Sequence, residues 1–236
     1  MSGTHLVVFD VDGTLTDTNA VGAEGFWRAT REVLSLPNEH SQWLEQVEHY
    51  TDLAMASQHC KAAFGRDITA PETDLLKRRL VGLLEAAVLT NPESIRAMPG
   101  AAAVLAALRT RSDCEAAIAT GCFRASAEFE LRTAGLFDAS LPIAGCDGLL
   151  SREEIMTSAA RQAAAKHGRE FSTITYVGDG VWDVRASQNL GWDFIGIGSG
   201  DAAERLRHAG ATTVLASFQP ATALLDALSK TAVRRI

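Results

Sequence analysis

Two pairs of aspartates stand at points where buried strands are predicted to end. Asp10 and Asp12 come directly after one apolar run, and Asp179 and Asp183 come after another. Like charges this close repel one another unless a cation compensates them, and carboxylate oxygens are the ligands that hard divalent cations such as Mg²⁺ prefer. Each pair alone also fits a polar turn or the capped start of a helix. Two pairs at two strand ends are better explained by one shared magnesium ion.

The elements that must position these carboxylates are short apolar strands that alternate with helices. Continuous apolar runs are typical of strands buried on both faces of a parallel sheet. Strands are predicted at residues 6–9, 115–119, 174–177 and 194–197, with weaker ones at 140–144 and 213–215. Helices are predicted between them at 101–111, 124–134, 153–167, 183–189 and 202–209. The alternation predicts an α/β fold with right-handed crossovers, in which ligands bind beyond the carboxyl ends of the strands.

One long segment interrupts the alternation of strands and helices. Between residues 18 and 97 no strand is predicted, and the helical patterns fall at 20–34, 40–64 and 73–89. Prolines at the ends of these patterns mark helix termini and a return loop. We therefore expect an inserted helical cap domain of residues 18–97, on a core domain formed by residues 1–17 and 98–236.

The composition excludes several classes of function. The 236 residues carry a formal net charge of −7, so non-specific nucleic-acid binding, which depends on Lys and Arg, is not expected. No run approaches the roughly 18 consecutive apolar residues of a membrane span, and the first residues lack a signal-peptide pattern. The four cysteines, at 60, 114, 122 and 146, lack the spacing of a zinc site. This favours reduced thiols in a cytoplasmic protein.

Taken in order, these motifs resemble those of the haloacid dehalogenase-like hydrolases, in the phosphatase-like branch with a helical cap after the first motif. The sequence DVDGTL at 10–15 is similar to the first motif of that family, IATG at 118–121 to the second, and GDGVWD at 178–183 to the fourth. The run from Gly196 to Ala211 is also similar. The resemblance implies a Rossmann-like three-layer core with a parallel sheet.

The resemblance also implies an enzyme: a magnesium-dependent phosphatase of small phosphorylated metabolites, similar to a phosphoglycolate phosphatase. Asp10 would be the nucleophile that forms an aspartyl-phosphate, and Asp12 would be the general acid and base. The Mg²⁺ would be held by Asp10, the backbone carbonyl of Asp12, and Asp179. Asp183 would contact the ion through water or hold the basic group of the site.

Substrate contacts implied by the resemblance come from three loops. Thr120 and the backbone amide of Gly121 would bind phosphate oxygens, together with Val11. The third motif departs from the family pattern, because this chain has Arg152 where the family usually has a lysine. Arginine keeps the positive charge and can bind phosphate through two hydrogen bonds. The alternative is that Arg152 is a surface residue in the first turn of a helix capped by Ser151.

The cap is expected to set substrate choice. The segment from His49 to Asp52 lies on the second cap helix or in a turn that interrupts it, and could face the site as a polar recognition patch, with His49 and Thr51 as the candidates for contact with substrate. A solvated helix face is the alternative. Trp182 either walls the pocket or packs in the core, whereas Trp27 and Trp43 have the spacing of core residues.

Two other functions of the same superfamily stay open. Asp12 argues against halide-displacing relatives, which lack an acid/base at that position. Lys61, the first lysine, lies deep in the second predicted cap helix, which argues against phosphonate cleavage through a Schiff base. The alternatives are a sugar-phosphate mutase and a catalytically idle binding or regulatory relative. Neither the substrate nor the oligomeric state follows from the sequence.

Overall fold

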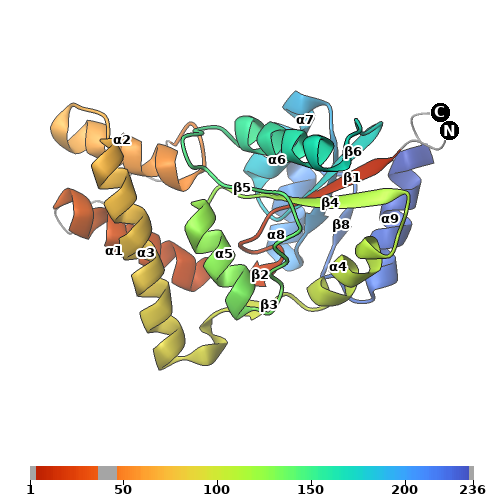
Figure 1. The fold of residues 1–236 in the computed structure, drawn as a ribbon, viewed down its shortest axis with the longest axis horizontal. Coiled ribbons are helices and arrows are strands. Elements are labelled where there is room, and N and C mark those ends of the chain that lie inside the picture. Colours follow the sequence, from red (N-terminus) through yellow and green to blue (C-terminus); the bar gives the residue numbers. More distant parts are fainter. Residues whose placement is uncertain (1–3, 37–46, 234–236) are drawn as a thin grey trace.

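A six-stranded parallel sheet lies at the centre of the molecule (Figure 1). The computed structural model describes residues 4–36 and 47–233. All six predicted strands are present, in the order β5-β4-β1-β6-β7-β8. Their bounds are β1 (His5–Phe9), β4 (Cys114–Ala119), β5 (Ile143–Ala144), β6 (Thr173–Gly178), β7 (Asp193–Ile197) and β8 (Val214–Leu215). The predicted α/β class with a parallel sheet is confirmed.

Helices cover both faces of the sheet, which makes the three-layer core. Alternate side chains of a strand point to opposite faces, and on β1 Leu6 and Val8 share one buried cluster while Val7 and Phe9 share another. The first cluster includes α6 (Arg152–His167) and α7 (Val181–Leu190), and the second includes α4 (Ala101–Arg109), α5 (Arg124–Thr133) and α9 (Ala221–Val233). The remaining core helix, α8 (Gly200–His208), packs beside β8.

Helix α9 was not predicted from the sequence. Its buried residues Leu224, Ala227 and Leu228 recur at helical spacing and pack under the sheet against Phe9 and Phe218. This spacing of three to four residues could therefore have been used to predict the helix.

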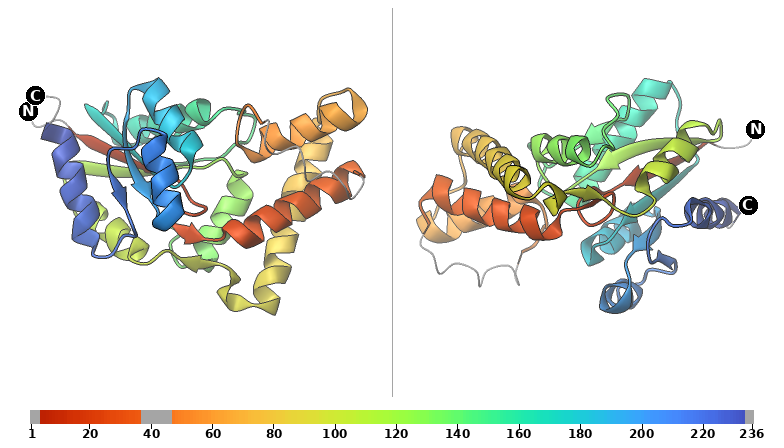
Figure 2. Two further views of the ribbon diagram at one scale, coloured as in Figure 1. Left: turned by 180° about the vertical axis from the view of Figure 1, so that it is seen from behind. Right: turned by 90° about the horizontal axis from the view of Figure 1, so that it is seen from below.

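Three helices form a separate group beyond the end of β1: α1 (Asn19–Leu34), α2 (Asp52–Phe64) and α3 (Ala70–Thr90) (Figures 1 and 2). Phe26 and Ala29 of α1 are buried in the same cluster as Leu76 and Leu80 of α3. The backbones approach closely, since a Cβ added to Gly25 would lie 3.3 Å from a methyl carbon of Leu80. The packing between α1 and α3 thus holds this group together.

A short antiparallel pair marks where the chain leaves the sheet and returns to it. Strand β2 (Thr16–Asp17) pairs with β3 (Arg96–Ala97), which follows the short 3₁₀ turn η2 (Pro92–Ser94). Arg96 also binds Asp17 through an exposed ion pair of 2.7 Å. Neither strand was predicted, because two-residue strands are too short to show a period. The pair lies at the predicted boundaries 17/18 and 97/98, and the division into two domains stays a prediction.

The helix predicted over 40–64 begins later in the structure than expected. Residues 47–51 form turns and bends, and α2 begins at Asp52. Thr51 has extended backbone and its hydroxyl accepts a hydrogen bond from the Ala54 amide, so it ends the turn and caps the helix. Trp43 and the rest of 37–46 lie outside the described residues. Within residues 4–36 and 47–233, no helix combines the length and apolarity that a bilayer-spanning segment requires.

Candidate active site

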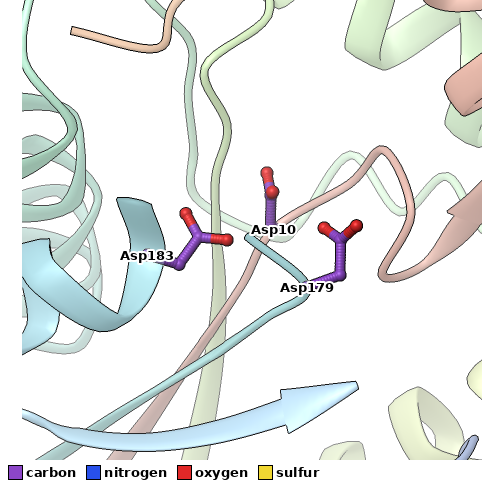
Figure 3. Close-up of side chains that lie close together, drawn as sticks. All are labelled: Asp10, Asp179 and Asp183. Atoms are coloured by element: carbon purple, nitrogen blue, oxygen red, sulfur yellow. The ribbon is translucent and has the colours of Figure 1, made fainter. Parts of the chain in front are cut away.

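Three carboxylates meet at the carboxyl end of the two central strands (Figure 3). Asp10 and Asp179 follow β1 and β6, which are paired in register with Phe9 opposite Val177. Asp183 comes from the first turn of α7. One oxygen of each carboxylate lies within 4.8 Å of the others. The parallel pairing of β1 with β6 therefore brings Asp10 of the first carboxylate pair to both members of the second, while the Asp12 carboxylate is not part of this cluster.

Hydrogen bonds balance the charges of these carboxylates only in part, as where the Thr14 hydroxyl donates to Asp179 Oδ1 at 3.3 Å. Burial, followed by the neighbouring negative charges, raises the pKa of Asp179 well above its ordinary value. Burial raises the pKa of Asp183 to about 7. One Asp183 oxygen accepts the Gly180 amide at 3.0 Å, while Oδ1 is buried and accepts no hydrogen bond. A buried, electron-rich oxygen cluster of this kind fits a hard divalent cation.

Arg152 is the cation that reaches this cluster. Its Nη1 lies 3.2 Å from Asp10 Oδ1 and 3.6 Å from Asp183 Oδ1. The side chain is 9% exposed, although Ser151 does cap the helix as the alternative interpretation required. Arg152 is thus buried at the site and is not a surface residue. Nη1 also lies 3.4 Å from the hydroxyl of Tyr176, which donates to the Ala119 carbonyl at 2.7 Å.

Asp12 belongs to a second, buried polar chain. The Thr18 hydroxyl hydrogen-bonds Asp12 Oδ1 and lies 2.9 Å from Glu130 Oε2. Both contacts draw on the single proton of one hydroxyl. Burial raises the pKa of Glu130 well above its ordinary value, which favours the neutral carboxyl there. Burial also raises the pKa of Asp12, to about 6.

Sequence reasoning missed both Thr18 and Glu130. Glu130 lies on the buried stripe of α5, with Ser126, Ala127 and Leu131. A carboxyl group on the apolar stripe of an amphipathic helix was the available signal.

The loop after β4 closes the side of the site opposite Asp179. Thr120 is buried and its hydroxyl accepts the Cys122 amide at 3.2 Å. A Cβ on Gly121 would lie 2.9 Å from both the Arg152 guanidinium carbon and the Tyr50 carbonyl oxygen. Only glycine allows this approach of the loop to the arginine. The predicted second motif therefore lies directly against Arg152.

The same loop is bonded to the start of α2. The Asp52 amide donates to the Gly121 carbonyl at 2.9 Å, and the Phe123 amide donates to Asp52 Oδ2 at 3.1 Å. Burial raises the pKa of Asp52 to about 7. Asp52 belongs to the segment 49–52 that was predicted as a polar recognition patch, and it lines the cavity described below.

A cavity of about 560 Å³ lies between the sheet edge and the three helices α1–α3. Seven of the predicted site residues line it: Asp10, Asp12, Thr51, Thr120, Gly121, Arg152 and Asp179. Asp183 lies behind them and reaches the cavity through its contact with Arg152.

Two predicted substrate contacts are not brought to the cavity. His49 is outside its lining, and the imidazole lies 3.9 Å from the exposed carboxylate of Glu48. The Val11 side chain is fully buried in the cluster with Phe9 and Leu15. His49 precedes the turn that enters α2, and Val11 points into the core, so neither side chain faces a ligand. Thr51 does line the cavity, but its hydroxyl donates to the Leu150 carbonyl at 2.9 Å.

Aromatic side chains form much of the remaining wall. Trp182 lines the cavity, and its ring stacks on Tyr50 at 3.9 Å between centroids and 9° between planes. Trp27 also lines the cavity, so the expectation that it is a core residue is wrong in part. Cys122 lies nearby as a free thiol whose pKa burial raises well above its ordinary value. It is therefore a neutral wall residue.

Comparison with known proteins decides the family. Residues 4–191 match the sequence model of the haloacid dehalogenase-like hydrolases. The chain belongs to this family. It is 26% identical over 230 residues to the probable phosphatase IndB of Dickeya dadantii, with 95% of each chain covered. The predicted family is thereby confirmed, and the chain is an enzyme of this hydrolase family.

Solved structures of this hydrolase family share the fold. CbbY from Rhodobacter sphaeroides, in complex with phosphate, superposes with a TM-score of 0.61 at 23% identity, covering 91% of this chain and 95% of CbbY. A "predicted phosphoglycolate phosphatase" from Haemophilus somnus gives a TM-score of 0.62 at 18% identity, covering 95% and 99%. At these identities the likeness concerns the fold alone.

Proposed function

We propose that this hydrolase is a magnesium-dependent phosphomonoesterase acting on small phosphorylated metabolites through an aspartyl-phosphate on Asp10. The observation that carries the proposal is the meeting of Arg152, Asp179 and Asp183 at Asp10, on the floor of the cavity. A carboxylate nucleophile needs positive charge beside it to approach an anionic phosphate. The name of the Dickeya relative, a probable phosphatase, supports the same reaction class.

The reaction would proceed in two steps, formation of the aspartyl-phosphate and its hydrolysis. In the first, an Asp10 oxygen attacks phosphorus, the bond to the ester oxygen breaks, and Asp12 donates its proton to that oxygen. In the second, Asp12 takes a proton from water, whose oxygen attacks phosphorus. Inorganic phosphate leaves and the Asp10 carboxylate is restored. The Asp12 pKa of about 6 suits a group that must both give and take a proton near neutral pH.

The metal-binding role belongs to the carboxylates whose charges are unbalanced. Asp10, Asp179 and Asp183 would hold Mg²⁺ with the backbone carbonyl of Asp12, because the three carboxylates already lie within one ligand sphere. When bound, Mg²⁺ supplies charge neutralisation for the phosphate and the carboxylates. Asp183 also orients Arg152.

The groups that would bind the phosphate also surround Asp10. Arg152 would donate from its guanidinium, with Thr120 and the Gly121 amide at the opposite loop.

The four cysteines are free, and three of them are buried, which supports the cytoplasmic location expected from the sequence.

The proposal is tested by release of phosphate from p-nitrophenyl phosphate and from a panel of phosphometabolites. We expect activity that is lost in EDTA and restored by Mg²⁺. Asp10→Asn should be inactive while keeping the wild-type circular dichroism spectrum and melting temperature within a few degrees. If the wild type and Asp10→Asn are equally inactive across the panel, the alternative of a catalytically idle binding or regulatory protein is favoured instead.

A further inference from the structure

The wall that faces the phosphate site is apolar and aromatic. Along α1, α2, α3 and the segment before α2 the cavity is lined by large uncharged side chains, namely Phe26, Trp27, Tyr50, Met55 and Leu80. Trp182 continues this wall on the core side, where it stacks on Tyr50. With phosphorus at Asp10, the esterified group must extend toward this wall.

Positive charge is scarce in the cavity. Among the described lining residues the cations are Arg152, which is occupied with Asp10 and Asp183, and Arg205, which is exposed on α8. The lysines and arginines of the described parts of 18–97 lie outside the lining. Several of them are paired elsewhere, as Arg79 is with Glu32 and Lys77 with Asp147. Residues 37–46 contain neither lysine nor arginine.

Acidic groups, in contrast, are already present around the esterified group. Asp52 and Glu130 both line the cavity beside Asp12 and are buried. Burial raises the pKa of Asp52 to about 7, so near neutral pH this group is partly ionised and offers no positive charge to a further anion. A carboxylate or second phosphate on the substrate would lose its water without gaining a cation.

We therefore propose that the substrate is a phosphomonoester whose esterified group is uncharged and presents a flat or apolar face to the wall. The proposal rests on the function proposed above and narrows it. A phosphoglycolate-like ester carries a carboxylate, and the bisphosphate of a sugar-phosphate mutase carries a second phosphate. Among the described lining residues neither anion finds a free buried cation, because Arg152 is paired with Asp10 and Asp183. The wall formed by Trp27, Tyr50 and Trp182 favours an aromatic or planar ring, since rings pack well on aromatic faces.

Matched esters test the proposal directly. Benzyl phosphate and 4-carboxybenzyl phosphate differ by one carboxylate, and ethyl phosphate and phosphoglycolate differ in the same way. We expect kcat/KM to be at least about tenfold higher for the uncharged member of each pair, and higher for benzyl than for ethyl phosphate. Equal values, or a preference for the charged members, would overturn the proposal while leaving the phosphatase activity standing. Hydrolysis of no ester at all would instead overturn the proposed function.

Charge placed in the wall gives the reciprocal test. Ala23 lines the cavity from α1 and is exposed there, so a lysine at this position does not disturb the core. Ala23→Lys should raise kcat/KM for 4-carboxybenzyl phosphate relative to benzyl phosphate by about tenfold, and Ala23→Gln should keep the wild-type ratio. An unchanged ratio in Ala23→Lys counts against the proposal. So does a selective loss of the charged esters in Arg205→Gln, because Arg205 would then be an anion site.

Discussion

Arg152 Nη1 lies 3.2 Å from Asp10 Oδ1, although the two residues are 142 positions apart in the chain. The arginine starts α6 and the aspartate ends β1, so the contact depends on α6 crossing over the sheet to begin beside the first strand. Its consequence is a buried cation at the carboxylate proposed to attack phosphorus. The family's usual lysine is replaced here by a guanidinium that also spans Asp183 and Tyr176.

Removal of this cation should be costly for catalysis. We expect Arg152→Ala to lower kcat/KM by about 10²–10³-fold, because a preorganised positive charge at the phosphate is lost. Arg152→Lys should recover part of the loss, since it keeps the charge but only one hydrogen-bonding nitrogen. Steady-state kinetics and the affinity for vanadate measure both effects. Unchanged kinetics in Arg152→Ala would show that another cation serves the phosphate.

Magnesium should stabilise the folded chain as well as activate it. A ligand present at about 100 times its Kd adds about 2.7 kcal/mol to the free energy of unfolding. We therefore expect the melting temperature to rise on addition of Mg²⁺ in the wild type and much less in Asp179→Asn. The exposed Asp226→Asn, on α9, is the control and should respond as the wild type does. Equal shifts in all three proteins would place the ion elsewhere.

Thr18 should act by positioning the carboxyl group of Asp12. Thr18→Val removes the hydroxyl that joins Asp12 to Glu130, and we expect kcat to fall by about tenfold or more with KM little changed. Thr18→Ser should restore the wild-type kcat. Glu130→Gln should lose less than Thr18→Val, because the neutral amide resembles the protonated acid. A change in KM alone, with kcat unaltered, would contradict this role.

Substitution of Gly22 on α1 should lower activity while raising stability. A Cβ on Gly22 would lie 2.8 Å from Asp12 Oδ2, so Gly22→Ala should displace that carboxylate and lower kcat. Replacing a helical glycine with alanine also stabilises a helix by up to about 1 kcal/mol. The matched control is Gly82→Ala on α3, where a Cβ would meet nothing within 4 Å. Both variants should melt higher than the wild type, and Gly82→Ala should keep full activity. Wild-type kcat in Gly22→Ala would refute the contact.

Asp52 should make stability depend on pH. Its pKa is raised from 3.8 to about 7 in the folded chain by burial. Below about pH 4 both states are protonated, and as pH rises to 7 the unfolded state ionises first, so the folded state loses relative stability. Above pH 7 the cost is complete, on the order of 2–4 kcal/mol.

Asp52→Asn removes this titration while keeping an oxygen for the Phe123 amide. The variant should unfold at higher urea concentration than the wild type at pH 8, and the difference should shrink toward pH 4. Asp67→Asn, an exposed substitution between α2 and α3, is the control and should track the wild type at every pH. A variant less stable than the wild type at pH 8 would show that the ionised carboxylate is the stabilising form.

Most elements, and the chemistry at the strand ends, could be predicted from the sequence. Continuous apolar runs marked β1, β4, β6 and β7, because burial on both faces leaves no polar alternation, whereas β5 and β8 gave weaker signals. The carboxylate pairs at 10–12 and 179–183 were readable because parallel strands present their ends at one edge. Arg152 was identified from its place in the order of the motifs, but its burial could not be predicted from the sequence.

Which side chains share the cavity depends on how the elements pack against one another. Strand order places β1 between β4 and β6, and no local pattern encodes that order. The contact of Thr18 with Glu130, the position of His49 outside the cavity lining, and the aromatic wall of Tyr50 and Trp182 follow from packing between segments far apart in the chain. Periodicity reports which face of an element is buried, whereas the identity of its neighbour is a non-local property that is fixed when the sheet and the helices pack.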